Sequence, residues 1–502
     1  MNYKKLIGVL MTGMLLGMAG QAVSAEDNIL YAARNFAYST LDAHDGDESW
    51  MIQGYGVVES LFKMADDMTV QPWLAESAEL DGNVWTIKLK DGVTFSNGNP
   101  MTADIVIKNL QRSAEKNAGK AILGEFTYNV VDDLTFTVES ETPYPTLPNL
   151  LAQPGNGIID VDSIQDFDTE TIGTGPFVIE DFVPAGDVTV TKNENYWGGD
   201  VKVDNVIVKS FSDGSALTAA LQTGDIQGTY GLQYDNYPLF ENNADYTINS
   251  CATSRCFFGQ FNMDSEIMQD QNVRKAVEMG IDKDGFCSVI MQGRGVPAKA
   301  AFPSSFSYGN DAVETVSYDP DGAKKLLEES GWTDTDGDGY VDKDGQKLSI
   351  NWLTYPTRLE QPKLAEYAQA TLKDIGIDVQ VNNTSDHRTF AENGEFDVYV
   401  SSTTTAPTGD PEYFFTSTVV GSKNYGNYQN EEVTKLTEQL HQTFDKDERG
   451  KLATELQQDI LDDDAFFFVS HLNMGIVTKS NVTGMAAHPC DYYEITADLD
   501  VE

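Results

Sequence analysis

Strand-like and helix-like runs alternate along nearly the whole of this 502-residue chain. Residues 83–89 and 132–140 alternate apolar and polar side chains, the period expected of half-buried strands. Residues 319–331 and 362–376 carry apolar side chains at helical spacing and end at glycine, and the second run leads into a strand-like run from 377. The interleaving predicts an α/β fold. The length predicts several domains, because one hydrophobic core rarely serves so many residues.

The N-terminus has the pattern of a secretory signal peptide. Lys4 and Lys5 precede an apolar run from Leu6, and small residues follow up to Ala25. This order predicts a signal peptide over residues 1–25 that is cleaved near Ala25. The apolar run is too short for a comfortable membrane span, and no second long apolar run follows. We therefore expect an exported protein whose mature chain has no transmembrane segment.

Acidic residues outnumber basic ones by 79 to 33, which gives a formal net charge of −46 at pH 7. Such a surface repels nucleic acid and anionic lipid headgroups, so we expect no nucleic-acid partner. A hydrophobic content of 40% indicates packed cores rather than disorder.

The four cysteines leave one pairing open. Export makes a disulfide possible, and Cys251 and Cys256 are the nearest pair in the sequence. On one extended strand they would lie roughly 16 Å apart, so a bond requires a turn at Thr253 and Ser254. The sequence does not decide between the strand and the turn.

Six segments resemble, in the same order, those of a known family. Residues 73–106 resemble the signature of the extracellular solute-binding proteins of the oligopeptide, dipeptide and nickel class (family 5), which deliver ligands to ABC importers. The other matches are GTGPF (173–177), KNENYWGG (192–199), ALQTGDI (220–226), NVRKAVEMGIDKDGF (272–286) and YDPDGAKKLLEESGW (318–332).

The resemblance implies a two-lobed periplasmic-binding-protein-like fold of the class II or cluster C type, with an inserted extra domain. Lobes of this kind close about a hinge around their ligand. We expect a monomeric, non-enzymatic protein in the periplasm or at the cell-envelope exterior, with the permease and ATPase subunits of an importer as partners. The implied boundaries are 26–60, 172–248 and 471–502 for the main domain of lobe one, 61–171 for the inserted domain, and 249–470 for lobe two.

The resemblance also implies which residues hold the ligand. Dipeptide-binding relatives hold a zwitterion with an arginine and a carboxylate, and here Arg358 and Asp410 match those positions. Each has an ordinary alternative: Arg358 as a solvated loop charge, and Asp410 as the cap of a helix that starts at Pro411.

The nickel and metallophore branch is the closer resemblance, because of the segments 357–362, 409–430 and 469–496. It implies that nickel or another transition-metal chelate is the ligand and that the protein has no cofactor. Arg34 is expected to add positive charge to the cleft. Imidazole suits nickel, and His44 is the first candidate for touching ligand or metal, with His471 the second. The remaining expected contacts are Thr404, Thr408, Tyr413, Asn424 and Tyr425.

An aspartate-rich stretch at 334–345 resembles a calcium loop but lacks its last ligand. Asp334, Asp336 and Asp338 occupy the first three ligand positions of an EF-hand, whereas Gly345 stands where the bidentate Glu is required. A helix and a strand flank the stretch, not two helices. We interpret it as a surface turn, with adventitious calcium at Asp334, Asp336 and Asp338 as a possibility.

Two other classes of function are weighed against a metal-chelate carrier. Within the family the alternative is a dipeptide- or oligopeptide-binding protein. Outside it, the alternatives are an exported hydrolase or a calcium-dependent surface module. The sequence has no G-x-S-x-G, H-E-x-x-H, Walker or dinucleotide-binding motif, which favours a carrier over an enzyme.

Overall fold

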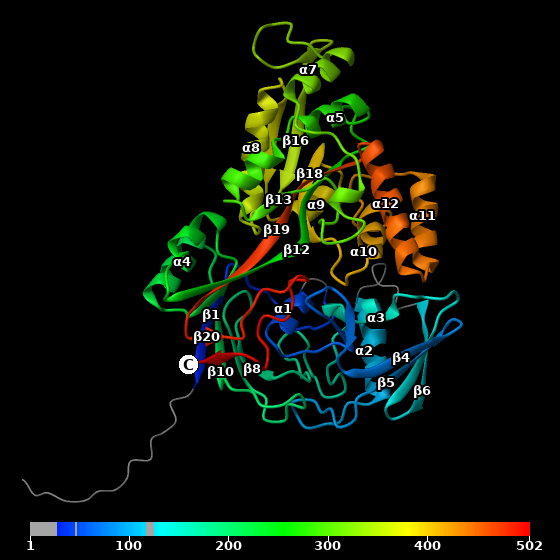
Figure 1. The fold of residues 1–502 in the computed structure, drawn as a ribbon, viewed down its shortest axis with the longest axis vertical. Helices are drawn as coiled ribbons and strands as arrows, with labels where there is room; N and C mark the ends of the chain where they lie inside the picture. Colours follow the sequence, from blue (N-terminus) through cyan, green and yellow to red (C-terminus); the bar gives the residue numbers. More distant parts are fainter. Residues whose placement is uncertain (1–27, 46–47, 117–124) are drawn as a thin grey trace, which may run out of the picture.

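The computed structural model describes residues 28–45, 48–116 and 125–502, which form two lobes stacked along the long axis of the molecule (Figure 1). The predicted signal peptide lies outside the described residues. Within those ranges, no helix has the length and apolar character needed to cross a membrane.

One sheet of eleven strands runs through both lobes, in the order β17-β16-β18-β12-β19-β11-β1-β10-β9-β8, with β13 also paired to β19. Its two long antiparallel strands, β12 (Tyr246–Phe261) and β19 (Phe466–Lys479), pass from one lobe to the other (Figure 1). The predicted boundaries between the lobes, at 248/249 and 470/471, fall inside these two strands. The waist of the molecule is therefore a strand pair and not a loose linker.

Lobe one contains the parallel pair of β1 and β10 at the centre of its part of the sheet. Helix α4 illustrates how its elements are delimited: the Asp213 carboxylate accepts a hydrogen bond from Ala216 N at 2.7 Å, and the helix ends at Gly224, whose φ is +85°. The elements of this part are β1 (Ile29–Arg34), α1 (Glu48–Gly54), β8 (Phe177–Phe182), β9 (Val188–Lys192), β10 (Asn205–Ser210), α4 (Gly214–Thr223), β11 (Gly228–Tyr230), η3 (Tyr234–Leu239), β20 (Val482–Thr483) and β21 (Asp500–Val501).

A four-stranded antiparallel sheet in the order β4-β5-β7-β6 forms the inserted domain, with α2 packed on one face. Its core is separate from that of the main sheet and includes the fully buried Leu110 and Phe136. The elements are β2 (Phe62–Met64), β3 (Val70–Pro72), β4 (Ala75–Asp81), β5 (Val84–Leu89), α2 (Ala103–Lys116), β6 (Thr127–Asp132), β7 (Thr135–Glu139), α3 (Leu147–Leu150) and η2 (Pro154–Asn156).

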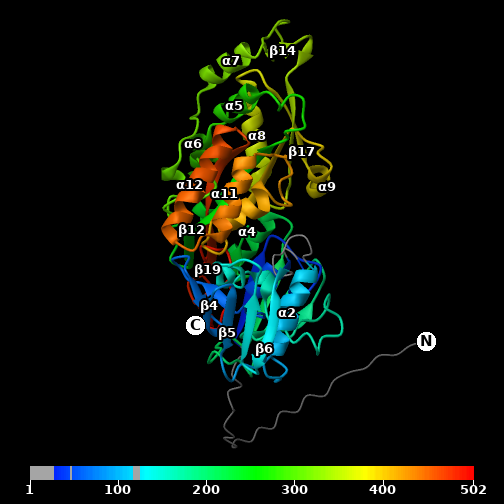
Figure 2. The same cartoon turned by 90° about the vertical axis from the view of Figure 1, so that its right-hand side faces the viewer.

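Lobe two packs helices on a parallel group of strands, β16 with both β17 and β18, which is joined antiparallel to β12. Helices α11 and α12 lie on the side of this lobe above the inserted domain (Figure 2). The elements are α5 (Gln271–Met279), α6 (Lys283–Gly285), η4 (Phe286–Ile290), β13 (Gly295–Pro297), η5 (Asn310–Ala312), α7 (Pro320–Glu329), β14 (Asp342–Lys343), β15 (Gln346–Lys347), β16 (Ser349–Thr354), α8 (Glu360–Lys373), β17 (Asp378–Asn383), α9 (His387–Glu392), β18 (Val398–Thr404), α10 (Glu412–Phe414), η6 (Phe415–Val419), α11 (Glu431–Gln442) and α12 (Lys446–Asp462).

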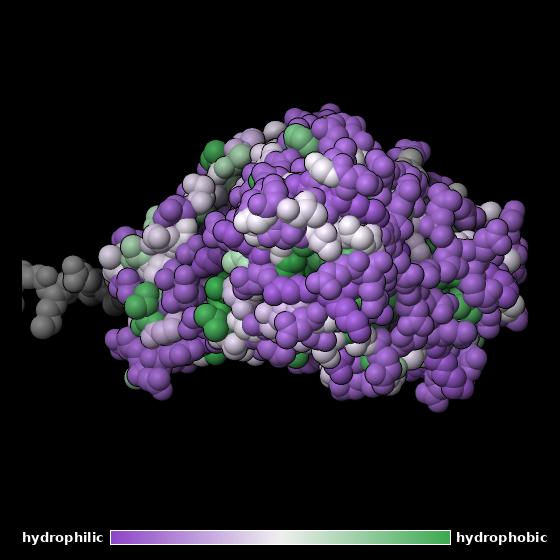
Figure 3. Space-filling model, turned by 90° about the horizontal axis from the view of Figure 1, so that it is seen from above, coloured by the Kyte–Doolittle hydropathy of each residue, from purple (hydrophilic) through white to green (hydrophobic). Residues whose placement is uncertain are grey.

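The α/β architecture expected from the alternating runs is confirmed. The run 319–331 becomes α7, the run 362–376 becomes α8, and the strand-like run from 377 becomes β17. The run 132–140 covers the turn between β6 and β7 as well as β7 itself. Seen from the lobe-two end, the surface is mainly hydrophilic (Figure 3), as the excess of acidic residues requires.

The open question about the cysteines is answered by β12. Cys251 and Cys256 lie on this one strand, and all four cysteines are free thiols. Although β12 is irregular between them, it does not fold back to bring the two sulfurs together. The described residues, which include all four cysteines, therefore contain no disulfide.

Candidate functional site

Side chains from both lobes converge at the waist on the carboxylate of Asp491, which is 3% exposed. Tyr230, at the end of β11, donates its hydroxyl to both carboxylate oxygens, at 2.8 and 3.0 Å. Arg255 donates Nη2 and Nε to Oδ2 of the same carboxylate, at 2.7 and 3.2 Å. Burial raises the pKa of Tyr230 well above its ordinary value, so its hydroxyl stays protonated and can donate.

A bulge in β12 explains the position of Arg255. Between Ala252 and Cys256, β12 advances four residues while β19 advances two. The Thr253 hydroxyl donates to Leu472 O at 2.8 Å and accepts from Arg255 N at 3.2 Å, which fixes the extra residues. Bulges re-aim side chains beside functional sites, and this one points a guanidinium toward Asp491.

Arg358 brings a second guanidinium from lobe two, in the segment between β16 and α8. Burial by itself would lower the pKa of Arg358, but the nearby Tyr230, Asp491 and Glu360 raise it above the ordinary value. Burial also raises the pKa of Glu360, and Arg358 opposes that shift. Arg358 therefore remains charged at the waist.

Aromatic rings and a small cavity complete this region. Trp50 of α1 donates its indole N–H to the backbone oxygen of Asp491 and packs on Tyr230, with ring centroids 6.1 Å apart. The ring centroids of Phe36 and Trp50 are 5.5 Å apart. The cavity beside Arg358 has a volume of about 20 Å³, room for about one water molecule. It is lined by Asn35, Gly231, Leu232, Tyr234, Tyr237, Arg358, Leu359, Glu360, Met474 and Gly475.

Arg34 lies in lobe one and is paired internally. Its Nη2 lies 2.7 Å from Glu494 Oε2, both side chains are 3% exposed, and its guanidinium lies 4.9 Å from the ring centre of Tyr55. Burial raises the pKa of Glu494, and Arg34 opposes that shift. Glu494 lies three residues after Asp491, so this ion pair anchors the segment that carries the central carboxylate.

The two predicted metal-binding histidines are not brought together. His44 is fully buried between the main and inserted domains: Arg112 Nη1 donates to its Nδ1 at 2.9 Å, and its Nε2 lies 2.9 Å from Gly157 O. Burial lowers the pKa of His44 to about 4. Because a guanidinium can only donate, Nε2 carries the proton and neither nitrogen of His44 is left for a metal.

His471 lies on β19 beside β12 and β13, directly after the predicted lobe boundary at 470/471. It is 3% exposed, and its Nε2 lies 3.2 Å from Asn310 Oδ1. Burial lowers the pKa of His471 to about 3. This environment keeps the imidazole neutral inside a packed core.

Asp410 forms a bidentate ion pair with Arg449 of α12, at 2.6 and 2.9 Å. It also accepts from Glu412 N at 2.9 Å, as expected of a residue that caps the turn at Pro411. Burial raises the pKa of Asp410, and Arg449 opposes that shift. The geometry thus matches the capping alternative for Asp410.

Of the other predicted contact residues, Thr404 lies beside the central cluster, whereas Asn424 and Tyr425 lie in one loop. Thr404 pairs with Arg255 across β18 and β12, so it adjoins the central cluster. Tyr413 accepts from Lys423 Nζ at 3.4 Å. Asn424 closes its own loop through two hydrogen bonds with the Tyr428 backbone, and Tyr425 packs edge-on against Tyr399 with ring centroids 5.6 Å apart. The last two therefore shape the loop around residue 425.

The lobes also touch through the inserted domain. Asn149 donates to Thr408 O at 2.8 Å, and Thr146 donates to Glu412 Oε2 at 3.1 Å. At Gly409, whose φ is +70°, an added Cβ would lie 2.0 Å from the backbone oxygen of Met68. Lobe two therefore meets the inserted domain here with no room for a side chain.

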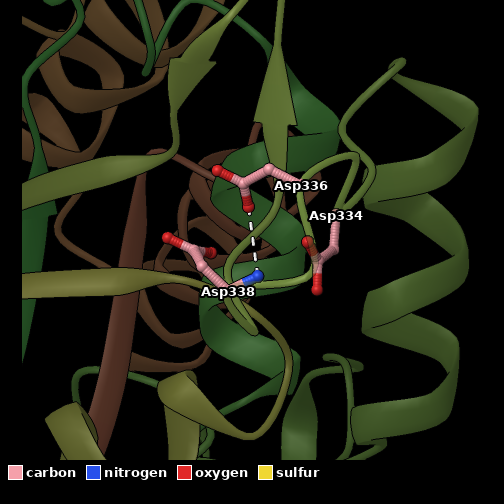
Figure 4. Close-up of side chains that lie close together, drawn as sticks. All are labelled: Asp334, Asp336 and Asp338. Carbon is pink, nitrogen blue, oxygen red and sulfur yellow. Dashed lines mark hydrogen bonds between the residues drawn. The ribbon is translucent and has the colours of Figure 1, made fainter.

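The aspartate-rich stretch forms an exposed turn, with Asp334, Asp336 and Asp338 near one another (Figure 4). Asp334 accepts from Gly337 N and Gly339 N, and Asp336 accepts from Asp338 N. Asp338 also pairs with Lys347 at 2.6 Å. The carboxylates thus already shape the turn, in agreement with its interpretation as a surface hairpin.

Comparison with known proteins identifies the class. Residues 69–426 match the family model of the bacterial extracellular solute-binding proteins, family 5 (middle). The chain belongs to this family, as the order of the sequence motifs predicts, and it is the solute-binding component of an ABC importer, a transport protein rather than an enzyme.

The particular relatives include carriers of two kinds. The chain is 28% identical to the oligopeptide-binding protein AppA of Bacillus subtilis, over 92% of this chain and 88% of the relative. It is 26% identical to the nickel-binding protein NikA of Staphylococcus aureus, over 89% of each. The structure of that NikA in complex with Ni(L-His)2 aligns with a TM-score of 0.84 at 24% identity, covering 95% of this chain and 100% of the other. The predicted two-lobed fold is thus confirmed.

Proposed function

We propose that the protein captures a small ligand with at least one carboxylate, nickel chelated by amino-acid ligands of the histidine type, and delivers it to the permease of an ABC importer. The observation that carries the proposal is the convergence of Arg255, Arg358 and Tyr230 at the waist. In a chain with a net charge of −46, two partly buried guanidinium groups lie here; Arg255 pairs with Asp491, and Arg358 is the one proposed to meet an anion.

The metal is proposed to arrive already chelated by small-molecule ligands. His44 and His471 are both buried. Burial lowers the pKa of His44 to about 4 and that of His471 to about 3. A chelate brings its own imidazole and carboxylate donors to the metal, so the protein needs only to recognise the outer carboxylate and the shape. Arg358 is the residue proposed to bind that carboxylate, and Thr404 and Tyr413 are further proposed contacts.

A small ligand requires less opening of this waist than a long peptide does. The cavity beside Arg358 measures about 20 Å³, and the strand pair and the inserted domain hold the two lobes in contact on both sides of it. The second candidate, an oligopeptide, is favoured by the likeness to AppA, and it requires a wider separation of the lobes.

Three further features belong to the proposal. The protein is exported, with cleavage near Ala25, and it acts as a monomer. Its domains are the main domain of lobe one (26–60, 172–248 and 471–502), the inserted domain (61–171) and lobe two (249–470). Closure of the two lobes on the ligand would then create the surface that the permease recognises.

A thermal-shift panel tests the proposal. The mature protein is heated with nickel alone, L-histidine alone, nickel with L-histidine, and di- to nonapeptides. The stabilisation is expected with nickel plus L-histidine and grows as RT ln(1 + [L]/Kd). A shift with peptides and none with nickel plus L-histidine would make the protein a peptide carrier. Hydrolysis of the added peptides would contradict a carrier of either kind.

A further inference from the structure

Residues 485–495, here named the C-terminal strap, carry Asp491 and are fastened to lobe one. Ile495 N donates to Gly54 O at 3.2 Å, and the Tyr493 hydroxyl accepts from Met64 N at 3.0 Å. Trp50 donates to the backbone oxygen of Asp491. With Glu494 paired to Arg34, the strap is held at Asp491 and at the residues 493–495 that follow it, so the Asp491 carboxylate has a fixed position.

The backbone of the strap is strained at the same place. Asp491 has a φ of +67° and Tyr493 a φ of +58°, in the left-handed region that residues other than glycine rarely adopt. Such conformations persist only where the surroundings enforce them, and they gather at ligand-binding sites. At this place the Asp491 carboxylate faces Tyr230 of lobe one and Arg255 of β12.

The charges at the waist can be counted from these contacts. Asp491 Oδ2 accepts both bonds from Arg255, so one negative charge offsets one positive charge inside the cluster. The charge of Arg358, from lobe two, acts on Asp491 and on Glu360 beside it. With Asp491 the two arginines are balanced by two carboxylates, and without Asp491 the waist would hold one positive charge in excess.

We propose that Asp491 is a specificity-determining residue that sets how much negative charge a ligand can carry into the cleft. By neutralising Arg255, it leaves Arg358 as the guanidinium available to the ligand. A ligand that presents one carboxylate, or a chelate neutral overall, is accepted, whereas a ligand with further negative charge is repelled by the fixed Asp491 carboxylate. This inference rests on the proposed function, because it concerns the ligand of the same site.

The test compares two nickel chelates of different charge by isothermal titration calorimetry. The probes are nickel with L-histidine, which forms a neutral bis-complex, and nickel–EDTA, which carries two negative charges. The quantity followed is the ratio of the Kd for nickel–EDTA to the Kd for nickel with L-histidine. Differences in ligand size cancel when this ratio is compared between variants.

Opposite changes are expected from the two partners of the ion pair. Asp491→Asn retains an oxygen for Tyr230 and removes the charge, and it is expected to lower the ratio by at least about tenfold. Arg255→Gln is expected to raise the ratio by a similar factor, and the double variant to restore it to within about threefold of the wild type. The control Glu448→Gln removes a negative charge that pairs with Lys451 on the exposed side of α12, and the ratio is expected to stay unchanged.

The outcomes separate the two proposals. If the wild type binds neither chelate, the proposed function is overturned and the inference falls with it. If the wild type binds nickel with L-histidine but the ratio is the same in Asp491→Asn, Arg255→Gln and the double variant, Asp491 only fastens the strap and the inference alone is overturned. Circular dichroism of each variant confirms folding, and Arg255→Gln keeps the test decisive should Asp491→Asn fail to fold.

Discussion

Replacing Gly409 with alanine is expected to weaken ligand binding by holding the lobes apart. The added Cβ would lie 2.0 Å from Met68 O, a backbone atom of the inserted domain that cannot move aside as a flexible side chain can. The clash exists only while lobe two touches the inserted domain, so it penalises the closed state. The positive φ of +70° strains alanine in both the open and the closed state and therefore does not change the affinity.

The magnitude follows from the cost of overpacking. Forcing an extra methyl group into a closed contact costs about 1–3 kcal/mol, which corresponds to an apparent affinity about 5- to 150-fold weaker. The control is Gly345→Ala in the exposed hairpin, where φ is +78° and nothing lies within 4 Å of the added Cβ. Both variants carry the same kind of backbone strain, but only Gly409→Ala blocks closure.

Calorimetric titration with nickel and L-histidine measures the effect, and denaturant unfolding of both variants measures the shared strain. The expected result is a similar loss of stability in the two variants and weaker binding in Gly409→Ala alone. Wild-type affinity in Gly409→Ala would refute the idea that binding requires this contact between lobe two and the inserted domain.

Three further predictions concern the waist, the buried histidine and the thiols. Arg358→Ala is expected to weaken binding of nickel with L-histidine by at least about 100-fold, since it removes charge-assisted hydrogen bonds worth about 1.5–3 kcal/mol each. Undiminished affinity in the same calorimetric assay would exclude Arg358 as the carboxylate-binding residue. Burial lowers the pKa of His44 from 6.5 to about 4 in the folded protein. Between these two pH values the unfolded chain therefore binds more protons than the folded protein does. The free energy of unfolding is expected to fall as the pH falls through this window, by at most about 3 kcal/mol. Gln in place of His44 can keep both hydrogen bonds without titrating. In urea unfolding from pH 7 to pH 4, His44→Gln is expected to lose less stability than the wild type. Equal losses would contradict the idea that His44 is buried in its neutral form. Because all four cysteines are free, the denatured protein is expected to give four thiols with Ellman's reagent without prior reduction, and two would indicate a disulfide.

The local elements could be predicted from the sequence because their signals are local. The helix α8 follows from apolar spacing and a glycine just after its end. The order of the family motifs extended this to the two-lobed fold. Capping and apolar spacing depend on residues that are close in the sequence, and the motif order depends on resemblance to a known family.

The family resemblance gave Arg358 as an expected ligand residue, but the rest of the centre of the candidate site could not be predicted in this way. Tyr230, Arg255, Arg358 and Asp491 are far apart in the sequence, and they meet only because β11, β12, the segment after β16 and the C-terminal strap converge at the waist. The bulge that aims Arg255 and the left-handed backbone at Asp491 leave no pattern in the residues themselves. One signal was present in the sequence, because an arginine inside an otherwise apolar strand-like run, such as Arg255, needs a specific partner.

His44 shows the opposite difficulty. Its place near the start of lobe one suggested the cleft, but its ring nitrogens are used by Arg112 of α2 and the backbone of Gly157. Both partners belong to the inserted domain and lie far along the chain. Residue type therefore indicated coordination chemistry, whereas the packing of two domains gives this imidazole a structural environment.

Small-angle X-ray scattering of the mature protein tests the central claim most directly. With nickel and L-histidine added, the radius of gyration is expected to decrease as the two lobes close around Arg358 and Asp491, and the decrease is expected to vanish in Gly409→Ala. A radius of gyration that stays the same in the wild type under saturating ligand would contradict closure as the mechanism of capture.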